Sequence, residues 1–236
     1  MNVLITGGTG FFGYWLSKTK PEGIHARHLN RNDYERSHWE WYDWDAVIHC
    51  ANVSPLRVIQ NHKGKLMYVS SGAVNDRDDE YTNNKRKWEA QCPKETIIVR
   101  PYCFLGEKIP DIYSIMWFIK DGLNGGPIHY YDVGCVRSYM HGFDLGTWMW
   151  KMLLEGNGTY DIGSDIPVNM GGLASTIADH FGCEAVADLP VEYEEQYKIY
   201  LPNTTRAREE LGLKMTIGLH EGIKRTVADA SIRIHS

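Results

Sequence analysis

The sequence predicts an α/β protein in which the strands of a parallel sheet alternate with helices along the chain. Three observations carry this prediction. Short, almost wholly apolar runs recur through the first half of the chain, helix-like stretches separate several of them, and a glycine-rich loop follows the first run. Near-continuous apolar strands are typical of a parallel sheet that helices cover on both faces.

The first half of the chain carries the expected sheet. Its strands are expected at residues 1–6, 25–29, 45–51, 66–70 and 96–100. A helix is expected to begin near residue 14 and to be ended by Pro21 and Gly23, and another helix is expected at residues 81–92.

Beyond Pro101 the pattern loosens, because Gly, Pro and aromatic residues increase between residues 104 and 137. Further helices are expected at residues 143–155, 172–182, 203–211 and 218–230. We therefore assign the sheet to residues 1–106 and a small C-terminal part to residues 107–236, interleaved with the first part around residues 138–163.

The composition limits the classes of function. The 236 residues are 43% hydrophobic and carry a net charge of −5, which suits a globular protein with no general attraction to nucleic acid or anionic membranes. No apolar run approaches the roughly 20 residues that span a bilayer. The sequence opens directly on a strand-like segment and its five cysteines form no C-x-x-C pair, so we expect a cytoplasmic protein with reduced thiols. No metal site is expected, because no histidine pair has a recognised metal-binding spacing.

The glycine-rich loop is Gly7-x-x-Gly10-x-x-Gly13, between the first strand and the first helix. Glycines let the backbone turn tightly and let N–H groups approach phosphates, and a helix N-terminus adds partial positive charge there. The pattern therefore predicts a Rossmann-like doubly wound sheet that binds the pyrophosphate of NAD(P). A glycine turn without a ligand is the alternative.

The end of the second strand bears on which dinucleotide binds. An acidic residue there would accept hydrogen bonds from the adenine ribose and favour NAD. Here the strand ends at Asn30 and Arg31, with no acid before Asp33. Arg31 could pair with a 2′-phosphate, so NADP is favoured over NAD; the alternative is that Arg31 is a solvated surface residue.

Ser71, Tyr81 and Lys85 form the candidate catalytic set. Tyr81 and Lys85 are four residues apart and share a face of the expected helix. A free phenol has a pKa near ~10, and a neighbouring ammonium favours the phenolate and lowers that value. Ser71 follows an apolar strand, at the sheet edge where ligands bind, and can donate a hydrogen bond to a substrate oxygen. An exposed helical pair is the alternative for Tyr81 and Lys85.

Taken together and in order, these segments resemble the extended short-chain dehydrogenase/reductase family of nucleotide-sugar epimerases, dehydratases and reductases. The resemblance covers nearly the whole chain and rests on segments 6–13, 45–51, 68–74, 81–85, 98–101, 126–134, 137–144, 158–163 and 206–212.

The resemblance implies a role for each matching residue. Tyr81 would be the acid/base, Lys85 its partner and Ser71 the anchor of the substrate hydroxyl. The implied cofactor-binding residues also include Gly7, Thr9, Gly10, Phe11, Phe12, Gly13, Asn30, Arg31, Cys50, Ala51, Asn52, Ser70, Pro101 and Tyr102. The C-terminal part would be a small substrate-binding lobe in which Arg137 contacts a substrate phosphate and Cys103 borders the substrate. A homodimer built on two helices is common in the family.

The chain also departs from the family pattern. The segments 30–45, 51–66 and 71–81 are contracted. Gly72 and Ala73 replace the Asp-Glu pair of the family's 4,6-dehydratases, so a dehydratase is disfavoured. Cys103 stands where many relatives carry Asn, which weakens the case for a nucleotide sugar.

The expected function is therefore hydride transfer at a carbinol or ketone carbon, most simply of a nucleotide sugar. An NADPH-dependent carbonyl reductase and a non-catalytic NAD(P) sensor or scaffold are the alternatives. The aromatic cluster of Trp39, Trp41, Tyr42 and Trp44 is a separate feature, either a surface-covering cluster, a stacking platform or a dimer contact.

Overall fold

A computed structural model describes residues 1–36, 38, 43–131, 134–188 and 198–235. These residues form two compact units. The first unit holds residues 1–102, 143–162 and 202–214, and the second holds residues 103–142, 163–201 and 215–236. The expected division was at residue 106; the chain leaves the first unit after Tyr102, and residues 202–214 also belong to that unit.

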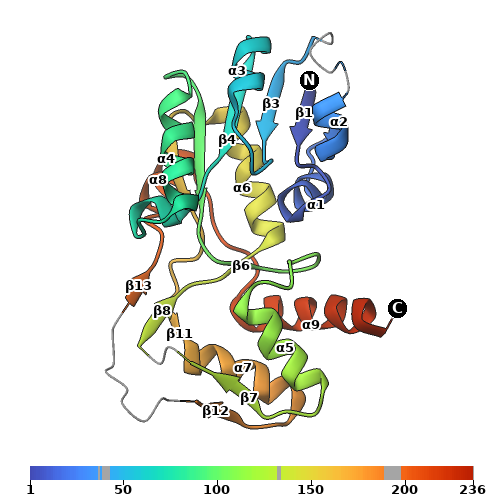
Figure 1. Cartoon of the computed structure of the whole chain (residues 1–236), viewed down its shortest axis with the longest axis vertical. Coiled ribbons are helices and arrows are strands. Elements are labelled where there is room, and N and C mark those ends of the chain that lie inside the picture. Colours follow the sequence, from blue (N-terminus) through green and yellow to red (C-terminus); the bar gives the residue numbers. More distant parts are fainter. Residues whose placement is uncertain (37, 39–42, 132–133, 189–197, 236) are drawn as a thin grey trace. The chain divides into compact units, whose positions relative to one another are not determined.

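The first unit is built on a six-stranded sheet in the order β10-β5-β4-β3-β1-β2, with every neighbouring pair parallel (Figure 1). Its strands are β1 (Asn2–Thr6), β2 (His25–Leu29), β3 (Ala46–His49), β4 (Lys65–Val69), β5 (Ile97–Pro101) and β10 (Thr159–Ile162). The strand order reverses between β1 and β3, which is where ligands bind in sheets of this kind. The predicted parallel α/β sheet is confirmed.

The burial of the strands explains why they form the centre of the unit. Val3, Leu4 and Ile5 of β1 are all fully buried, as are the four residues of β3, so these strands bury side chains on both faces. Strand β2 lies at the edge of the sheet and alternates between exposed and less exposed positions. A continuous apolar strand and an alternating one thus occupy the centre and the edge, as expected for a parallel sheet.

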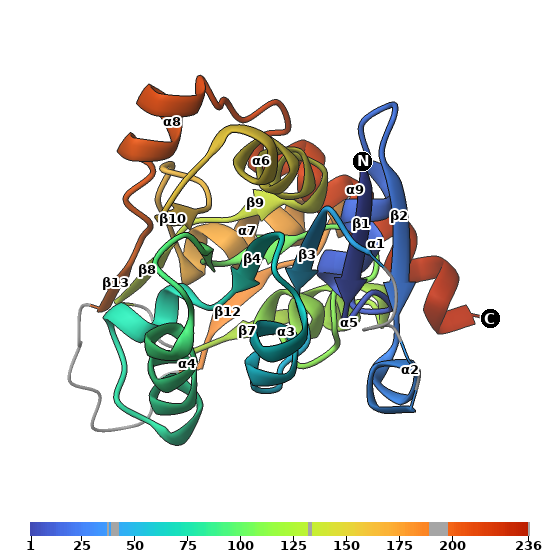
Figure 2. The ribbon, with the colours of Figure 1, turned by 90° about the horizontal axis from the view of Figure 1, so that it is seen from above.

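Helices cover both faces of this sheet. They are α1 (Phe11–Lys18), α2 (Arg31–Arg36), α3 (Leu56–Asn61), α4 (Glu80–Gln91), α6 (Gly142–Glu155) and α8 (Thr205–Leu211). Figure 2 shows α3 and α4 on one face and α6 on the other. Helix α6 packs against α1, where the Trp150 indole donates to the Leu16 carbonyl over 2.9 Å.

The contracted segments 30–45 and 51–66 each contribute a short helix. Segment 30–45 contributes the six-residue helix α2 directly after β2, and segment 51–66 contributes the six-residue helix α3. Trp44 packs against the buried cluster that surrounds Leu4 and Tyr34. Trp39, Trp41 and Tyr42 lie outside the described residues.

The second unit consists of helices and short strands. Its helices are α5 (Ser114–Leu123), α7 (Met170–Phe181) and α9 (Leu219–His235). Its strands are β6 (Phe104–Leu105), β7 (Ile128–Tyr130), β8 (Cys135–Arg137), β9 (Met140–His141), β11 (Val168–Asn169), β12 (Ala185–Ala187) and β13 (Lys198–Tyr200). None of the helices described in either unit has the length and apolar composition required to cross a membrane.

The limits of the first and the last expected helix were wrong. The first helix begins at Phe11 rather than near residue 14, because Gly10 takes the N-cap position, and it ends at Lys18, before Pro21 is reached. The last helix continues to His235 rather than ending at residue 230.

Candidate dinucleotide and catalytic site

The glycine loop lies at the C-terminal end of β1, beside the point where the strand order reverses. Gly7 has a φ of +69°, and a Cβ at this position would lie 2.8 Å from the Ala51 nitrogen. A Cβ at Gly13 would lie 2.2 Å from the Gly8 carbonyl oxygen. The packing of the first unit itself therefore requires glycine at both positions.

Gly10 differs from its two neighbours in the motif. Its φ is −81°, and the nearest atom to an added Cβ is the Gly7 oxygen, 3.4 Å away. It is the N-cap of α1, with no side-chain cap and no acidic residue in the first helical turn. Neither the backbone conformation nor the packing at position 10 requires glycine. A phosphate that approaches the N–H groups of the helix terminus would require it, because a side chain there would obstruct the approach. The loop therefore fits a dinucleotide.

A pocket of about 540 Å³ lies at the C-terminal ends of β1, β2 and β3. Five of the residues implied by the resemblance line it: Gly7, Thr9, Arg31, Ala51 and Asn52. Its other lining residues were not anticipated from the sequence: Tyr34, Glu35, Val53, Ser54, Leu56 and Arg57. They come from α2, from α3 and from the loop before α3, and only the adjacency of the strands brings them to one place.

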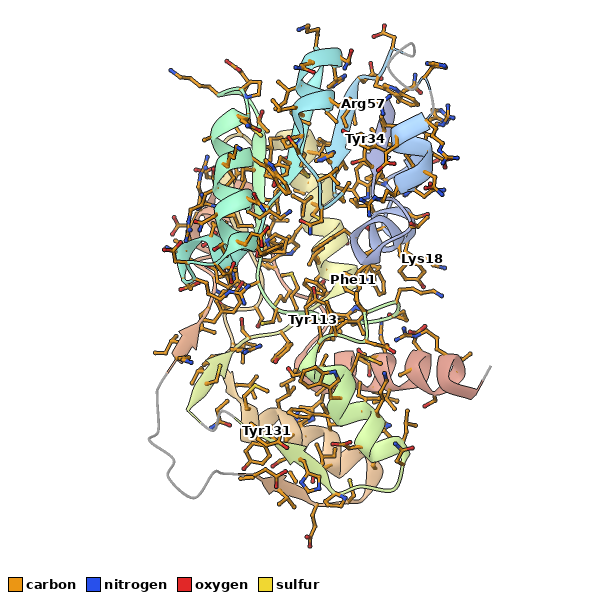
Figure 3. All side chains as sticks on the ribbon, viewed as in Figure 1. Phe11, Lys18, Tyr34, Arg57, Tyr113 and Tyr131 are labelled. Carbon is orange, nitrogen blue, oxygen red and sulfur yellow. The ribbon has the colours of Figure 1, made fainter. Side chains whose placement is uncertain are left out.

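Two charged contacts mark the walls of this pocket. Arg31 Nε pairs with Glu35 Oε1 at 3.2 Å along α2. Arg57 donates to the Tyr34 carbonyl oxygen, and its guanidinium lies 5.3 Å from the centre of the Tyr34 ring (Figure 3). The pocket thus has two cationic groups and one carboxylate on its lining.

Other implied cofactor residues lie outside the pocket lining. The Asn30 Oδ1 accepts from the Asp33 backbone nitrogen at the start of α2, and burial raises the pKa of the Cys50 thiol to about 12. Phe11 is buried, with its ring packed edge-on to those of Phe12 and Trp15. The buried ring of Phe11 serves the packing of the unit, so a contact of Phe11 with a cofactor would involve its backbone.

The start of α4 fixes the position of Tyr81. Asp79 is the N-cap, and it forms a reciprocal capping box with Thr82: Thr82 N donates to Asp79 Oδ1 over 2.8 Å, and Asp79 N donates to Thr82 Oγ1 over 3.0 Å. Tyr81 is the second residue of the helix and 40% exposed. Its ring is therefore held in the first turn while remaining open to solvent.

Lys85 lies one turn further along α4 and is buried. Its Nζ donates to the Val69 carbonyl oxygen over 3.2 Å, at the end of β4. The rings of Tyr68, Tyr81 and Trp88 surround the ammonium at 5.3, 5.8 and 5.5 Å from Nζ to the ring centres. Burial lowers the pKa of Lys85 to about 8. Lys85 thus places a buried cation among three aromatic rings, one of which belongs to Tyr81.

Ser71 follows β4 by two residues, so it emerges from the strand end that Lys85 contacts. It is the N-cap of a 3₁₀ turn, Gly72–Asn75, and its Oγ accepts from the Ala73 nitrogen over 3.2 Å. A Cβ at Gly72 would lie 2.3 Å from the Tyr102 ring. The close packing against Tyr102 explains why position 72 carries no side chain.

A hydrogen-bonded network joins the turn after Ser71 to the helix that carries Tyr81. Asn75 donates to the Tyr102 hydroxyl over 3.1 Å and accepts from Arg100 over 3.2 Å. Arg100 in turn forms a bidentate pair with Glu89 of α4, at 3.0 and 2.6 Å. Burial raises the pKa of Tyr102 to about 12. The phenol of Tyr102 therefore takes part in this network, and its ring forms the floor under Gly72.

Ser70 and Pro101 are both buried at the ends of neighbouring strands. Ser70 N donates to the Val99 oxygen over 2.8 Å, and Pro101 is the last residue of β5. These contacts fix the strand ends from which Ser71 and Tyr102 follow.

Arg137 and Cys103 belong to the second unit. Arg137 is half-buried, and its Nε donates to the Cys135 sulfur over 3.2 Å. In the described part of the chain Arg137 forms no ion pair with a carboxylate. The carbonyl oxygen of Cys103 accepts a hydrogen bond from the Met140 backbone nitrogen. A half-buried guanidinium without a carboxylate partner suits an anionic ligand. Across the residues described, no group of three or more His, Cys, Asp or Glu side chains could hold a metal ion.

The fold and the glycine loop together define a class of fold: the first unit has the predicted Rossmann-like, doubly wound parallel sheet. No protein-family model matches the sequence, and no curated protein sequence matches it either. Solved structures do match, over nearly the full length of both chains.

Three of these structures illustrate the likeness. UDP-glucuronic acid 4-epimerase from Bacillus cereus in complex with NAD has a TM-score of 0.85 and 15% identity, over 98% of this chain and 99% of the epimerase. UDP-glucose 4-epimerase from Thermotoga maritima with UDP-glucose has a TM-score of 0.81 and 19% identity, over 99% of this chain and 100% of the epimerase. RMD from Pseudomonas aeruginosa complexed with NADPH has a TM-score of 0.80 and 19% identity, over 98% of this chain and 99% of RMD. The predicted resemblance is thereby confirmed at the level of the fold.

Proposed function

We propose that this protein is an NAD(P)-dependent enzyme that transfers a hydride at a carbinol or ketone carbon of a nucleotide sugar. The observation that carries the proposal is the placement of Lys85: its buried ammonium reaches the end of β4, from which Ser71 follows, while Tyr81 lies one turn away on the same helix. A glycine loop that fits a dinucleotide lies on the same edge of the sheet.

The residues that would hold the cofactor are those of the glycine loop and the pocket beside it. When bound, the nicotinamide supplies or accepts the hydride. The loop N–H groups would bind the pyrophosphate, and the pocket at the ends of β1, β2 and β3 would take the adenosine. Arg31 on the pocket wall supports a preference for NADP over NAD.

Each catalytic side chain has a distinct task. The Tyr81 hydroxyl would exchange a proton with the reacting substrate oxygen, and the Lys85 ammonium would favour the phenolate form of Tyr81. Ser71, whose oxygen is oriented by the Ala73 nitrogen, would donate a hydrogen bond to the same substrate oxygen. Pro101 and Tyr102 would border the nicotinamide.

The substrate proposal rests on Arg137 and on the relatives in fold. Arg137 is a half-buried guanidinium that forms no ion pair with a carboxylate among the described residues, and it would bind a diphosphate group; solved structures of the same fold hold UDP-sugars. Gly72 argues against a dehydratase, because an acidic side chain there would collide with the Tyr102 ring. Epimerisation or reduction remains as the reaction.

A panel of UDP-, dTDP- and GDP-sugars tests this function. Purified protein is incubated with each sugar and with NADPH or NADH, and the products are separated and weighed by mass spectrometry. We expect at least one sugar to be epimerised or reduced. Tight NADPH binding without turnover of any sugar would contradict the proposal. Turnover of simple carbonyl compounds alone would indicate a general carbonyl reductase, the alternative that Cys103 in place of the family's Asn supports.

A further inference from the structure

Lys85 is the buried charge on which the proposed acid–base chemistry depends. It is 3% exposed, and none of the ion pairs among the described residues includes it. The carboxylate of Glu89, one turn along α4, is held instead by Arg100 in a bidentate pair at 3.0 and 2.6 Å. A buried ammonium without a paired carboxylate is unfavourable and tends to lose its proton. Other groups must therefore stabilise the charged form of Lys85.

The titratable groups that face Lys85 supply little compensating charge. Burial raises the pKa of the Cys50 thiol to about 12 and lowers the pKa of the His49 imidazole to about 4, so both groups are neutral near pH 7. Burial also raises the pKa of Tyr68, whose phenol stays neutral as well. Of these neighbours that interact electrostatically with Lys85, Glu89 carries the negative charge, and that charge is already paired.

Three aromatic rings surround the ammonium in place of a paired carboxylate. The Lys85 Nζ lies 5.3, 5.8 and 5.5 Å from the ring centres of Tyr68, Tyr81 and Trp88. The face of an aromatic ring attracts a cation, most strongly when the ring is an indole, and the attraction grows when the cation is desolvated. Trp88 therefore has the ring best suited to stabilise this buried ammonium.

Trp88 makes this contact because of its place on α4. It lies three residues after Lys85 and seven after Tyr81, so the three side chains share one face of the helix. Tyr68 is fully buried in β4, and Tyr81 belongs to the proposed catalytic set. Replacement of the half-buried Trp88 would therefore change the surroundings of the ammonium and leave the strand and the acid–base group in place.

We propose that Trp88 is a positioning residue for Lys85, in that its indole face holds the ammonium in the charged form at the end of β4. The contact of Nζ with the Val69 carbonyl oxygen, at 3.2 Å, then fixes where the charge is presented, at the strand end from which Ser71 follows. The part that this charge plays in catalysis rests on the proposed function. The contact between ring and ammonium does not, because it requires neither cofactor nor substrate.

Titration of the Lys85 side chain by NMR, in protein labelled with ¹³C-lysine, tests the contact directly. The Cε resonance of Lys85 is the one that Lys85→Met lacks, and it is followed from about pH 6 to about pH 11 in the parent and in Trp88→Leu, Trp88→Phe and Trp117→Leu. We expect the pKa of Lys85, about 8 in the parent, to fall by about one pH unit in Trp88→Leu and by less in Trp88→Phe, which keeps a weaker aromatic face. Trp117→Leu, at a 57% exposed position on α5, is the matched control and should leave the titration unchanged.

The two Trp88 variants separate the effect of the aromatic face from that of side-chain volume. A Lys85 titration that is unchanged, or moved to higher pH, in Trp88→Leu overturns the proposal. An equal fall in both variants overturns it as well, because burial rather than the ring face would then set the charge.

Turnover is the second measurement. The alkaline limb of the pH profile for a responsive sugar should move to lower pH together with the Lys85 titration. A limb that stays in place while the titration moves would overturn the positioning role. A titration that moves as expected in a protein that turns over no sugar contradicts the proposed function and leaves the contact between Trp88 and Lys85 supported.

Discussion

At the scale of single residues, the three glycines of the loop have different reasons to be glycine. Gly7 and Gly13 are required by neighbouring backbone, since an added Cβ would lie within 3.0 Å of it. Gly10 has room for a Cβ and a φ that any residue can adopt. Packing therefore explains glycine at positions 7 and 13, and it does not explain glycine at position 10, where we propose that a phosphate approaches.

The pair Gly10→Ala and Gly13→Ala tests this distinction. Gly10→Ala should change the free energy of unfolding by about 0.5–1 kcal/mol at most, as N-cap substitutions by Ala do, and should weaken NADPH binding by about ten-fold or more. Gly13→Ala should destabilise the protein by about 1–3 kcal/mol, because the Gly8 backbone must move. Urea unfolding and NADPH titration measure the two effects. Normal NADPH binding by Gly10→Ala would show that no phosphate approaches this position.

The burial of Lys85 that its proposed role requires lowers the stability of the folded chain. Burial lowers its pKa from 10.5 to about 8, so below pH 8 the folded chain holds an ammonium in an unfavourable environment. Between pH 8 and 10.5 the unfolded chain binds more protons than the folded chain, and the contribution of this group to stability rises with pH.

Lys85→Met removes this cost. At pH 7 we expect the variant to be more stable than the parent by about 1–3 kcal/mol, with a difference that shrinks as the pH approaches 10. Lys87→Met, at an exposed position on the same helix, is the control and should change stability little at either pH. Urea unfolding at pH 7 and pH 9.5 measures both. A Lys85→Met variant that is less stable at pH 7 would contradict the account of burial.

From the sequence, candidate catalytic residues could be proposed more readily than the residues that line the pocket. Ser71, Tyr81 and Lys85 could be proposed because each belongs to a local pattern: a strand end, and a four-residue spacing on a helix. Glu35 and Arg57 could not, because no local spacing relates them. They reach one pocket only because β2 and β3 both flank β1, a fact of topology rather than of sequence distance.

At the scale of elements, helix α4, which carries Tyr81 and Lys85, is held in place by contacts near both of its ends. Its capping box fixes where the helix begins, and Arg100 pairs with Glu89 near its other end. Arg86 holds the preceding segment against the helix by donating to the Val74 and Arg77 carbonyls. The short segment between Ser71 and Tyr81 is thereby fixed to the helix it precedes.

Loss of the cap should move Tyr81. Asp79→Ala removes the acceptor for the Thr82 nitrogen, and we expect a loss of about 1 kcal/mol in the free energy of unfolding. Turnover should fall by more than the loss of folded protein accounts for, because Tyr81 lies in the helical turn that frays. Asp78→Ala is the matched control, since the Asp78 side chain is 86% exposed, caps nothing that is described, and forms only a solvent-screened pair with Arg86 at 3.4 Å. Equal effects of the two substitutions on turnover would argue against the positioning role of the cap.

Several elements of the first unit were predicted closely from the sequence. The second strand, at residues 25–29, matches β2, and the helix expected at 81–92 matches α4 within one residue. Helix α5 was missed, because its buried face of Ile115, Phe118 and Ile119 lies in a region rich in glycine and aromatic residues. The strands of the second unit have two or three residues each, too few to show alternation.

At the scale of the whole molecule, the chain builds two units and returns to the first one twice. The sheet, the glycine loop, Ser71, Tyr81 and Lys85 all belong to the first unit, and Arg137 and Cys103 to the second. Under the proposed function, dinucleotide binding and acid–base chemistry would belong to the first unit, and Arg137 of the second unit would bind the substrate anion.

Cofactor binding should therefore protect one unit selectively. NADPH at about 100 times its dissociation constant should stabilise the protein by about 2.7 kcal/mol, with hydrogen-exchange protection gained at residues 7–13, α2 and α3. Amide exchange followed by mass spectrometry, with and without NADPH, measures this directly. Protection gained in α5 and α7 instead of the glycine loop would place the cofactor elsewhere.

The most direct test of the central claim is the Tyr81→Phe variant, measured for turnover and for NADPH binding on the same preparation. The account predicts that turnover of the responsive nucleotide sugar falls by about 100-fold or more, as expected when a general acid–base group is lost, while NADPH binds as it does to the parent. A Tyr81→Phe variant that retains full turnover would contradict the assignment of Tyr81, Lys85 and Ser71 as the catalytic set.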